Sequence, residues 1–403
     1  MTDPSTATGP SEHKGSVALN VFGRTDVGQI REHNEDNFLV ADLTRGTRSL
    51  REVDRHQVVG RRGTVLGVCD GMGGAAAGEV ASQLAVDIIY EQLLSGPTPT
   101  SRDDFASRLV NAVEHAGARI FNEARSDRSR RGMGTTATVA ALIDSRLFVA
   151  QVGDSRAYIL RDGALQQITR DQSLVNQLIE AGQLTEEEAE SFEHNNIILQ
   201  ALGTAETVQV DLTFADLKRG DVLLLCSDGL SGMVRSDDIR EILVSQNEPI
   251  EACRQLTERA NEAGGHDNIT VIVAHFDGDG LDDLPESGGE ALRYAKYTLP
   301  DRLENSDETR GRRRESFGTA PPRASTETTG PAVAATTTRA AAVPTGAGER
   351  SIGRRVTSEP EPLYDAEEDP VHIPTKGLPP ALVGIIVLST MVLVAVMGFF
   401  LLQ

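Results

Sequence analysis

The chain has few of the residues on which many kinds of functional site depend. Its 403 residues include no tryptophan, only three cysteines and only 4% aromatic residues, and 39 basic residues stand against 60 acidic ones. The net charge of −21 argues against nucleic-acid binding, because domains that bind nucleic acids normally carry a basic patch. The odd number of cysteines, without a Cys-x-x-Cys pair, favours reduced and buried thiols in a cytosolic domain. These cysteines are Cys69, Cys226 and Cys253.

The two ends of the chain have opposite character. Residues 1–16 are rich in Ser, Thr, Pro and Gly and lack an apolar core, so we expect a disordered tail without a signal peptide. Residues 381–402, in contrast, are apolar apart from Ser389 and Thr390. As a helix they would span about 33 Å, which is enough to cross a bilayer core of about 30 Å. We therefore predict a single-pass transmembrane helix within residues 378–403 that anchors the chain in the cell membrane.

The segment before this predicted anchor is polar and irregular. Residues 278–377 show neither helical nor strand periodicity and are rich in Ala, Thr and Pro, so we predict a disordered linker that cannot offset its ordering entropy by burial. Residues 17–277 remain as one folded domain. Its side of the membrane follows from the positive-inside preference, which predicts a cytoplasmic domain because three basic residues precede the anchor. These are Arg354, Arg355 and Lys376.

The pattern within the folded domain predicts an α+β architecture. Between residues 136 and 168, strand-like runs are separated by turns so short that they must join antiparallel strands. Helices expected in consecutive pairs beside such strands favour a layered α+β domain over a doubly wound one. Amphipathic periodicity predicts these helices at 78–94 and 105–124, and then at 236–244 and 250–263.

Aspartates stand at the edges of several predicted strands. Two apolar runs end in Asp-Gly, a third run ends in Gly-Asp-Ser-Arg, and a fourth begins after Asp-Asn. Carboxylates without a His or Cys cluster suggest oxygen-only ligation of a hard divalent cation, Mg²⁺ or Mn²⁺, and therefore phosphate chemistry. A structural calcium site is disfavoured because no loop has EF-hand spacing. The four aspartates are Asp70, Asp154, Asp228 and Asp267, whereas Asp162-Gly163 is expected to be only a turn.

Six short motifs follow one another along the chain. They are Asn34-Glu35-Asp36, Asp70-Gly71-Met72-Gly73-Gly74, Gly132-Met133-Gly134-Thr135-Thr136, Gly153-Asp154-Ser155-Arg156, Ser227-Asp228-Gly229-Leu230-Ser231 and Gly265-His266-Asp267-Asn268. In this order they resemble the motifs of the bacterial type 2C metal-dependent serine/threonine protein phosphatases. The resemblance covers residues 17–276. It implies a four-layer α-β-β-α sandwich, in which two antiparallel sheets are flanked by helix pairs, with a metal centre at one edge.

The resemblance also implies a role for individual residues. Asp70 would bridge two Mn²⁺ or Mg²⁺ ions, Gly71 would offer its carbonyl to one of them, and Asp228 and Asp267 would complete the other. A third, weaker ion would lie between Asp154 and Asp228. The remaining positions implied are a catalytic, phosphate-binding arginine, two acids that hold metal-bound waters and two asparagines that support the ligands. These are Arg31, then Glu35 and Asp36, then Asn34 and Asn268.

The implied reaction is hydrolysis of phosphoserine and phosphothreonine in proteins. Coordination by divalent cations can lower the pKa of water from about 15.7 to near 7, so a metal-activated water can attack phosphorus in line without a covalent intermediate. Met72 stands where eukaryotic relatives have a histidine, so the proton donor to the leaving group stays open between His33 and water, with water favoured. We expect Thr135 and Thr136 to begin a buried strand, with their hydroxyls satisfied locally. The partners implied are phosphoproteins, among them bacterial Ser/Thr protein kinases, and we expect a monomeric catalytic domain.

Two other interpretations of the domain have specific sequence requirements. A catalytically weak phosphatase-like module that recruits partners at the membrane would usually lack a ligating aspartate, and none is missing here. A phosphatase with an aspartyl nucleophile would need Asp-x-Asp, whereas the chain has Asp70-Gly71-Met72.

The long polar segment 42–63 departs from the tight link expected between the first strands. We interpret it as an extended hairpin or loop insertion, and a docking surface for an acidic partner is the alternative. It carries six arginines, Arg45, Arg48, Arg51, Arg55, Arg61 and Arg62.

Overall fold

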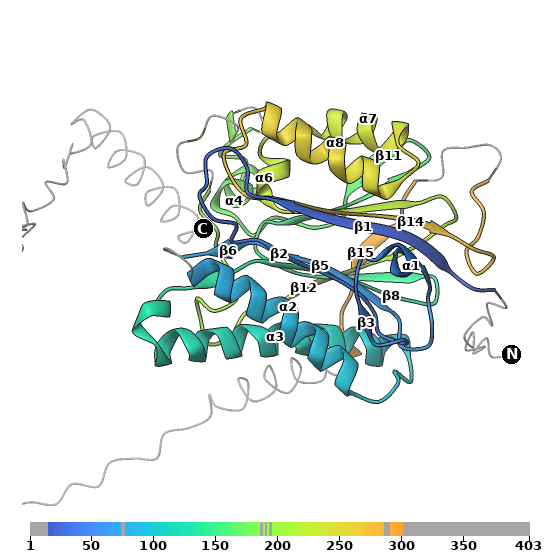
Figure 1. The fold of residues 1–403 in the computed structure, drawn as a ribbon, viewed down its shortest axis with the longest axis horizontal. Helices are drawn as coiled ribbons and strands as arrows, with labels where there is room; N and C mark the ends of the chain where they lie inside the picture. Colours follow the sequence, from blue (N-terminus) through green and yellow to red (C-terminus); the bar gives the residue numbers. More distant parts are fainter. Residues whose placement is uncertain are drawn as a thin grey trace, which may run out of the picture. The chain divides into compact units, whose positions relative to one another are not determined.

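Two antiparallel sheets lie face to face between two layers of helices (Figure 1). This computed structural model describes residues 15–73, 77–185, 188–189, 192, 196–285 and 291–300. The predicted transmembrane anchor, nearly all of the predicted N-terminal tail and most of the predicted linker lie outside the described residues. Within the described ranges, no helix is both long and apolar enough to cross a membrane.

The first sheet has six strands in the order β11-β10-β13-β14-β1-β4. Its central pairs are long and regular: β1 and β14 run antiparallel in register from Ala18 opposite Asp277 to Asp26 opposite Ile269. The strands are β1 (Ala18–Asp26), β4 (His56–Val58), β10 (Arg156–Arg161), β11 (Ala164–Gln167), β13 (Val222–Cys226) and β14 (Ile269–Asp277).

The second sheet has seven strands in the order β15-β12-β9-β8-β5-β2-β3. A separate two-stranded ribbon, β6 (Gly71–Met72) with β7 (Gly134–Thr135), continues from one end of it. The seven strands are β2 (Asn37–Asp42), β3 (Thr47–Arg48), β5 (Thr64–Cys69), β8 (Ala137–Ile143), β9 (Arg146–Val152), β12 (Asp211–Asp216) and β15 (Tyr294–Lys296).

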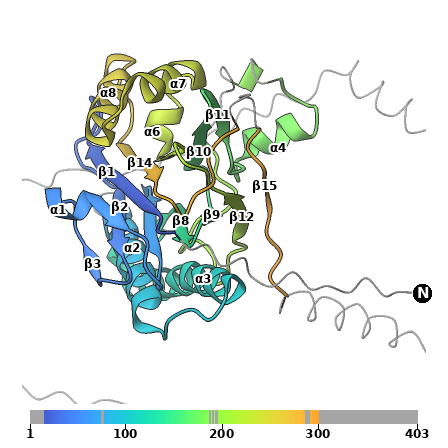
Figure 2. The same cartoon turned by 90° about the vertical axis from the view of Figure 1, so that its right-hand side faces the viewer.

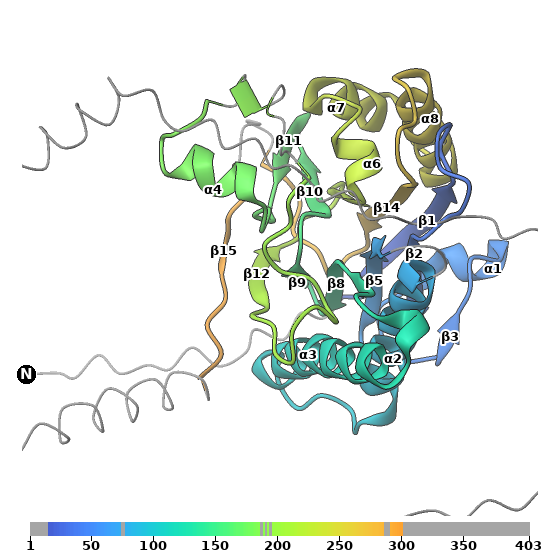
Figure 3. The ribbon, with the colours of Figure 1, turned by 90° about the vertical axis from the view of Figure 1, so that its left-hand side faces the viewer.

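One pair of long helices covers the outer face of each sheet (Figures 2 and 3). The pair α2 (Ala77–Ser95) and α3 (Arg102–Ser126) packs on the seven-stranded sheet, and α7 (Ser236–Ser245) and α8 (Pro249–Glu262) pack on the six-stranded one. The Ser101 hydroxyl caps α3 by accepting the Asp104 N–H at 3.1 Å. Shorter helices are α1 (Glu52–Arg55), η1 (Arg128–Arg130), α4 (Leu174–Glu180) and α6 (Asp228–Ser231). The prediction of two antiparallel sheets flanked by helix pairs is confirmed.

Three apolar layers hold this sandwich together. Alternate residues of β13 face opposite ways, so that Leu223 and Leu225 pack between the sheets while Leu224 and Cys226 face α7 and α8. All three cysteines are buried and unpaired, as predicted. Burial raises the pKa of the Cys253 thiol to about 12, which makes it a packing residue and not a nucleophile.

The folded domain continues beyond the predicted boundary at residue 277. Leu281 and Leu299 are buried, and β15 adds to the edge of the seven-stranded sheet by pairing with β12. The prediction of a disordered linker from residue 278 is therefore wrong for residues 278–285 and 291–300. Three residues of strand and two isolated leucines are too few to produce a periodicity that sequence alone would show.

The arginine-rich segment 42–63 ties the edges of the two sheets together. It forms the β2–β3 hairpin, then α1, and then β4, which pairs with β1 of the other sheet. Arg48 pairs with Asp87 on α2, and Arg62 donates to the carbonyls that end this helix, among them Gly96 at 2.8 Å. The hairpin interpretation is thus correct, and Arg48 and Arg62 have internal partners.

Candidate metal centre

Strand pairing gathers the predicted site aspartates at one end of both sheets. In the seven-stranded sheet, Asn37 pairs with Cys69, which places Asp36 opposite Asp70. In the six-stranded sheet, Cys226 pairs with both Arg156 and Val271, so residues just beyond these positions meet as well. Those residues are Asp154, Asp228 and Asp267. In Figure 1 this end is marked by β6, α4 and α6.

The carboxyls of Asp70 and Asp228 lie within hydrogen-bonding reach of each other. Burial first, and then the neighbouring carboxylates, raise the pKa of Asp70 well above its ordinary value. The same two causes raise the pKa of Asp36 and of Asp154 to about 7 each and also raise the pKa of Asp228. Such a cluster is electrostatically unfavourable when all its members are ionised, unless positive charge is added.

Several oxygens of this cluster have no partner within the described part of the chain. The buried Oδ1 atoms of Asp36, Asp154 and Asp228 accept no hydrogen bond there. Buried carboxylate oxygens without a donor are costly, and a divalent cation satisfies them. All ligand candidates are oxygens, which is the donor set that Mg²⁺ and Mn²⁺ prefer. The residues present therefore fit a hard-cation centre.

The acidic side chains of the cluster do not converge on a single point. Among the described residues, no three His, Cys, Asp or Glu side chains form a group that could hold one metal ion. This arrangement still suits small divalent ions, because Mg²⁺ is usually bound through one or two carboxylates and keeps several waters.

Gly71 and Glu35 lie against the start of α2. A Cβ added at Gly71 would come within 2.4 Å of the backbone oxygens of Glu35 and Gly78, so only glycine allows this approach. The Glu35 side chain lies over Gly78, and burial is the main cause that raises the pKa of its carboxyl. Both predicted positions thus border the cluster.

Arg31 lies at the exposed rim of the site. Its Nη2 donates to Asp267 Oδ2 at 2.7 Å, and the two side chains are 52% and 37% exposed. Partial burial works against the charge, but Asp267, Glu35 and Asp228 together raise the pKa of the guanidinium. The predicted phosphate-binding arginine is therefore held beside the predicted ligands.

The two predicted supporting asparagines hold the loop that carries Glu35 and Asp36. Asn268 accepts the Glu35 N–H at 2.8 Å and donates to the His33 carbonyl at 3.0 Å. Asn34 accepts the Asp36 N–H at 3.1 Å. The asparagines therefore act on the backbone of the acidic loop, which fixes where its carboxyls begin.

Two hydroxyl residues that sequence reasoning did not assign to the site bind the aspartates directly. The Thr136 hydroxyl accepts the Asp70 N–H at 2.9 Å and shares a hydrogen bond of 2.7 Å with the Ser155 hydroxyl. The Ser227 hydroxyl donates to Asp36 Oδ2 at 2.8 Å and so links the ends of the two sheets.

The expectation that the threonine hydroxyls are satisfied locally is confirmed only in part, because the Thr135 hydroxyl donates to the neighbouring Thr136 carbonyl at 3.0 Å but both hydroxyls also bond distant residues. Thr135, like Thr136, reaches Asp70, whose carbonyl accepts its hydroxyl at 2.8 Å. The only signal in the sequence was that Ser227 and both threonines lie within the motifs themselves.

A cavity of about 380 Å³ opens beside the aspartates. Asp154, Asp228 and Asp267 line it together with residues of α4, which contributes Val175 and Ile179. This mixture of carboxylate and apolar walls can receive a phosphorylated side chain and part of its peptide.

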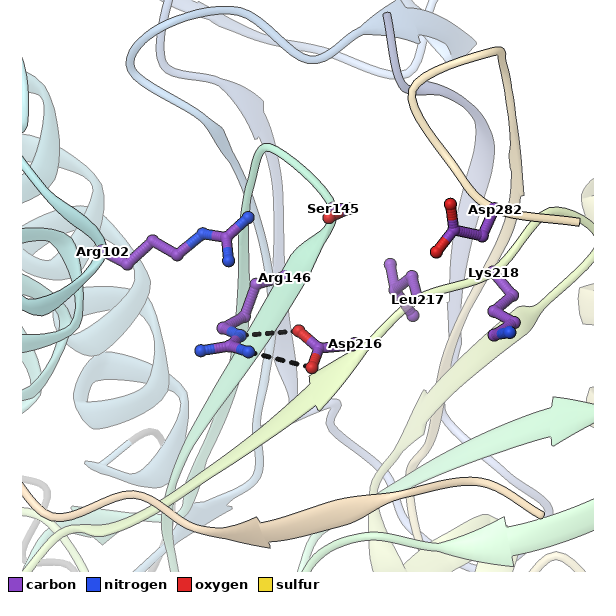
Figure 4. Close-up of a pocket in the computed structure, with 7 residues that line it drawn as sticks. All are labelled: Arg102, Ser145, Arg146, Asp216, Leu217, Lys218 and Asp282. Atoms are coloured by element: carbon purple, nitrogen blue, oxygen red, sulfur yellow. Dashed lines mark hydrogen bonds and ion pairs between the residues drawn. The ribbon is translucent and has the colours of Figure 1, made fainter. Parts of the chain in front are cut away.

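A smaller cavity of about 230 Å³ lies at the opposite end of β9 and β12 (Figure 4). There Arg146 donates two hydrogen bonds, of 2.7 and 2.9 Å, to Asp216. Acidic and basic side chains alternate around it, so it lacks the excess of carboxylates that marks the first cavity.

Comparison with known proteins agrees with this geometry. A family model described as protein phosphatase 2C matches residues 47–269. The serine/threonine phosphatase stp of Listeria monocytogenes is 36% identical over 254 residues, which are 63% of this chain and 94% of that protein. PstP of Mycobacterium tuberculosis is 37% identical over 259 residues, which are 64% of this chain and 45% of that protein.

Solved structures show the same likeness. The crystal structure of the M. tuberculosis phosphatase PstP/Ppp has a TM-score of 0.55 at 36% identity and covers 66% of this chain and 99% of that one. The PstP catalytic domain in complex with two manganese ions has a TM-score of 0.54 at 35% identity, over 65% of this chain and 99% of that one. The chain therefore belongs to the protein phosphatase 2C family and is a protein phosphatase.

Proposed function

We propose that the chain hydrolyses phosphoserine and phosphothreonine in proteins at a centre of two Mn²⁺ or Mg²⁺ ions. The observation that carries this proposal is the cluster of buried carboxyls with raised pKa values, three of whose oxygens lack a partner among the described residues. The related PstP catalytic domain is in complex with two manganese ions, which supports the proposal of two ions and of Mn²⁺ as the metal.

The residues present would divide the work of holding these ions. Asp70, which follows β5, would bridge the two ions, Gly71 would offer its carbonyl to one of them, and Asp228 and Asp267 would complete the other. Glu35 and Asp36 would hold waters, and Asp154 with Asp228 would take a third ion. When bound, the ions would supply positive charge to offset the carboxylates and would activate a water for attack on phosphorus.

Arg31 would bind the phosphoryl group. Its guanidinium is half exposed and uses one nitrogen for Asp267, so the other N–H groups can turn toward phosphate oxygens. The α4 side of the cavity would hold the flanking peptide. Together these contacts would orient the phosphorus above the carboxylates.

The leaving oxygen needs a proton, and we assign its donation to water. Met72 lies in β6 and carries no titratable proton. Asn268 donates a hydrogen bond to the His33 carbonyl, but the His33 side chain is exposed and makes no hydrogen bond into the cavity within the described part of the chain.

A matched pair of variants tests the proposal. In the full chain, Asp70→Asn should lower turnover of a phosphothreonine peptide with Mn²⁺ by ~10³-fold or more, because it removes the bridging charge. Asp162→Asn changes the same residue type in another Asp-Gly pair, in a turn at φ 50° that asparagine accepts, and should leave turnover unchanged. Chelator should abolish wild-type turnover and Mn²⁺ should restore it. Equal turnover of the Asp70 variant and wild type would overturn the mechanism.

The same assay distinguishes a phosphatase from a catalytically weak phosphatase-like module that recruits partners. Such a module would bind the phosphopeptide without releasing phosphate at any Mn²⁺ concentration. The sequence retains Asp70, Asp228 and Asp267, which favours the enzyme.

We further propose that the enzyme opposes bacterial Ser/Thr protein kinases from the cytoplasmic face of the cell membrane. The apolar stretch 381–402 and the preceding basic residues support the anchor. Removal of residues 378–403 should move the protein from the membrane fraction to the soluble fraction. A phosphoprotein comparison of cells with and without the enzyme would identify its targets.

A further inference from the structure

Tyr297, the residue that follows β15, fixes this segment onto the seven-stranded sheet. The Tyr297 N–H donates to the Leu212 carbonyl at 2.7 Å, and its hydroxyl donates to Asp103 on α3. The Tyr297 ring packs edge-on against Phe148 and Phe214, with ring centroids 5.1 and 5.5 Å apart. This segment is therefore an integral strand of the domain, beside β12 in Figure 3.

Lys296 of β15 begins a series of hydrogen bonds that leads toward the aspartates. Its Nζ donates to Asp211 Oδ1 at 2.8 Å, and Gln172 Nε2 donates to Asp211 Oδ2 at 2.9 Å. Each oxygen of the Asp211 carboxylate thus holds a different partner. The carboxylate connects the added strand to the segment that leads into α4.

Gln172 in turn clamps the backbone of Gly153. The Gln172 N–H donates to the Gly153 carbonyl at 2.9 Å, and the Gly153 N–H donates to Gln172 Oε1 at 2.9 Å. Gly153 has φ +104°, and a Cβ there would lie 2.6 Å from the Thr136 side chain. The turn is therefore held in a single backbone position from two sides.

Asp154 follows directly on this clamped glycine. Its side chain is buried, and its Oδ1 has no hydrogen-bond partner among the described residues. Its place in the acidic cluster therefore depends on the backbone of the turn more than on bonds of its own side chain.

We propose that Gln172, Asp211 and Lys296 are positioning residues for Asp154, so that the C-terminal segment bearing β15 tunes how tightly Asp154 holds a divalent cation. The inference rests on the proposed function, which assigns a cation to Asp154. Lys296 is 68% exposed, and an exposed ion pair alone contributes little. Its influence comes from orienting Asp211, which holds Gln172.

Mn²⁺ binding to the metal-free full chain, measured by titration calorimetry, tests this inference. The relevant quantity is the affinity of the Mn²⁺ site that Asp154→Ala removes. Gln172→Met should weaken it ~10-fold, because the side chain loses bonds to both Gly153 and Asp211. Lys296→Met should weaken it about threefold, and Lys296→Arg, which keeps the cation, should stay within about twofold of wild type.

A second readout needs neither metal nor turnover. The Gly153 amide proton is bonded to the Gln172 side chain, so its hydrogen exchange should accelerate in Gln172→Met and, less strongly, in Lys296→Met.

Asp216→Asn is the matched control. Asp216 lies at the other end of β12, the strand that begins with Asp211. It pairs with Arg146 (Figure 4) and is not part of the series of hydrogen bonds that leads from Lys296 to Gly153. It should change neither the Mn²⁺ titration nor Gly153 exchange.

The inference is overturned if Asp154→Ala leaves Mn²⁺ binding intact, if Gln172→Met binds like wild type, or if Asp216→Asn weakens binding equally. Failure of the proposed function would look different, because wild type would then release no phosphate from the phosphopeptide with Mn²⁺.

Discussion

Arg31 donates a 2.7 Å hydrogen bond to Asp267, and 236 residues of chain separate the two. One is the predicted phosphate-binding residue and the other a predicted metal ligand. In the proposed function, a phosphate that binds Arg31 would therefore lie beside the cations, and the guanidinium would exchange part of its contact with Asp267 for phosphate oxygens. This pairing would link substrate binding to the proposed metal centre.

We expect Arg31→Ala to lower kcat/KM for a phosphopeptide by about 10- to 100-fold, because charge-assisted hydrogen bonds to phosphate are lost. Arg31→Lys should recover only part of the loss, since an ammonium cannot bind two oxygens in a fork. Steady-state kinetics measures both. Arg254→Ala is the control, because Arg254 pairs with Glu258 on the outer helix α8. A kcat/KM for Arg31→Ala equal to that of the control would contradict the assigned role.

The metal-free protein should lose stability as pH rises. Burial raises the pKa of Asp36 and Asp154 to about 7, whereas their unfolded values lie near 3.9. Between these values the folded state binds more protons than the unfolded state, so the free energy of unfolding falls with increasing pH. With chelator, Tm should therefore decrease from pH 5 to pH 8.

Mn²⁺ should remove most of this decrease, because cations stabilise the ionised carboxylates. Asp154→Asn should flatten the dependence in the metal-free protein, since one of the carboxyls with a raised pKa is gone. Thermal melts across the pH range measure both effects. A Tm that is independent of pH in chelator would show that the pKa values of these carboxyls are not raised in the folded protein.

The sequence predicts the positions of the site aspartates better than it predicts the residues that hold these aspartates in place. Asp70 and Asp228 each follow an apolar run and precede glycine, a local pattern that places them at strand ends. Gln172 has no such pattern, since its partners Gly153 and Asp211 lie 19 and 39 residues away, and only the fold brings them together.

The sequence also did not predict which sheet each short strand joins. The three residues of β4 and the three of β15 join sheets whose other strands are distant in the chain. Short strands take their place from tertiary pairing, and periodicity does not tell which sheet a strand joins.

Thr136→Val should lower both stability and turnover. The hydroxyl accepts from Asp70 and bonds Ser155, so the isosteric change leaves buried partners unsatisfied at a cost of about 1–3 kcal/mol. The displaced Asp70 should also weaken activity of the folded enzyme. Thr257→Val is the matched control, because among the described residues that hydroxyl bonds only to the Cys253 carbonyl within α8.

Denaturant unfolding and turnover per folded molecule test this prediction. The control should lose some stability while its turnover stays at the wild-type value. If both variants kept full turnover, Thr136 would be a packing residue alone.

The ion pair between Arg161 and Asp221 should stabilise the fold without affecting catalysis. Its side chains are 4% and 0% exposed, and two hydrogen bonds of 2.9 and 2.7 Å join them. Asp221→Ala leaves a buried guanidinium unpaired and should cost about 3–5 kcal/mol of unfolding free energy. Arg161→Met combined with Asp221→Leu should cost much less, because no charge is then stranded.

Turnover per folded molecule should equal that of wild type in both proteins, since Arg161 ends β10 while Asp154 precedes its start. Urea unfolding with parallel assays separates the two quantities. A double variant as unstable as Asp221→Ala would mean that shape, and not the stranded charge, determines the loss.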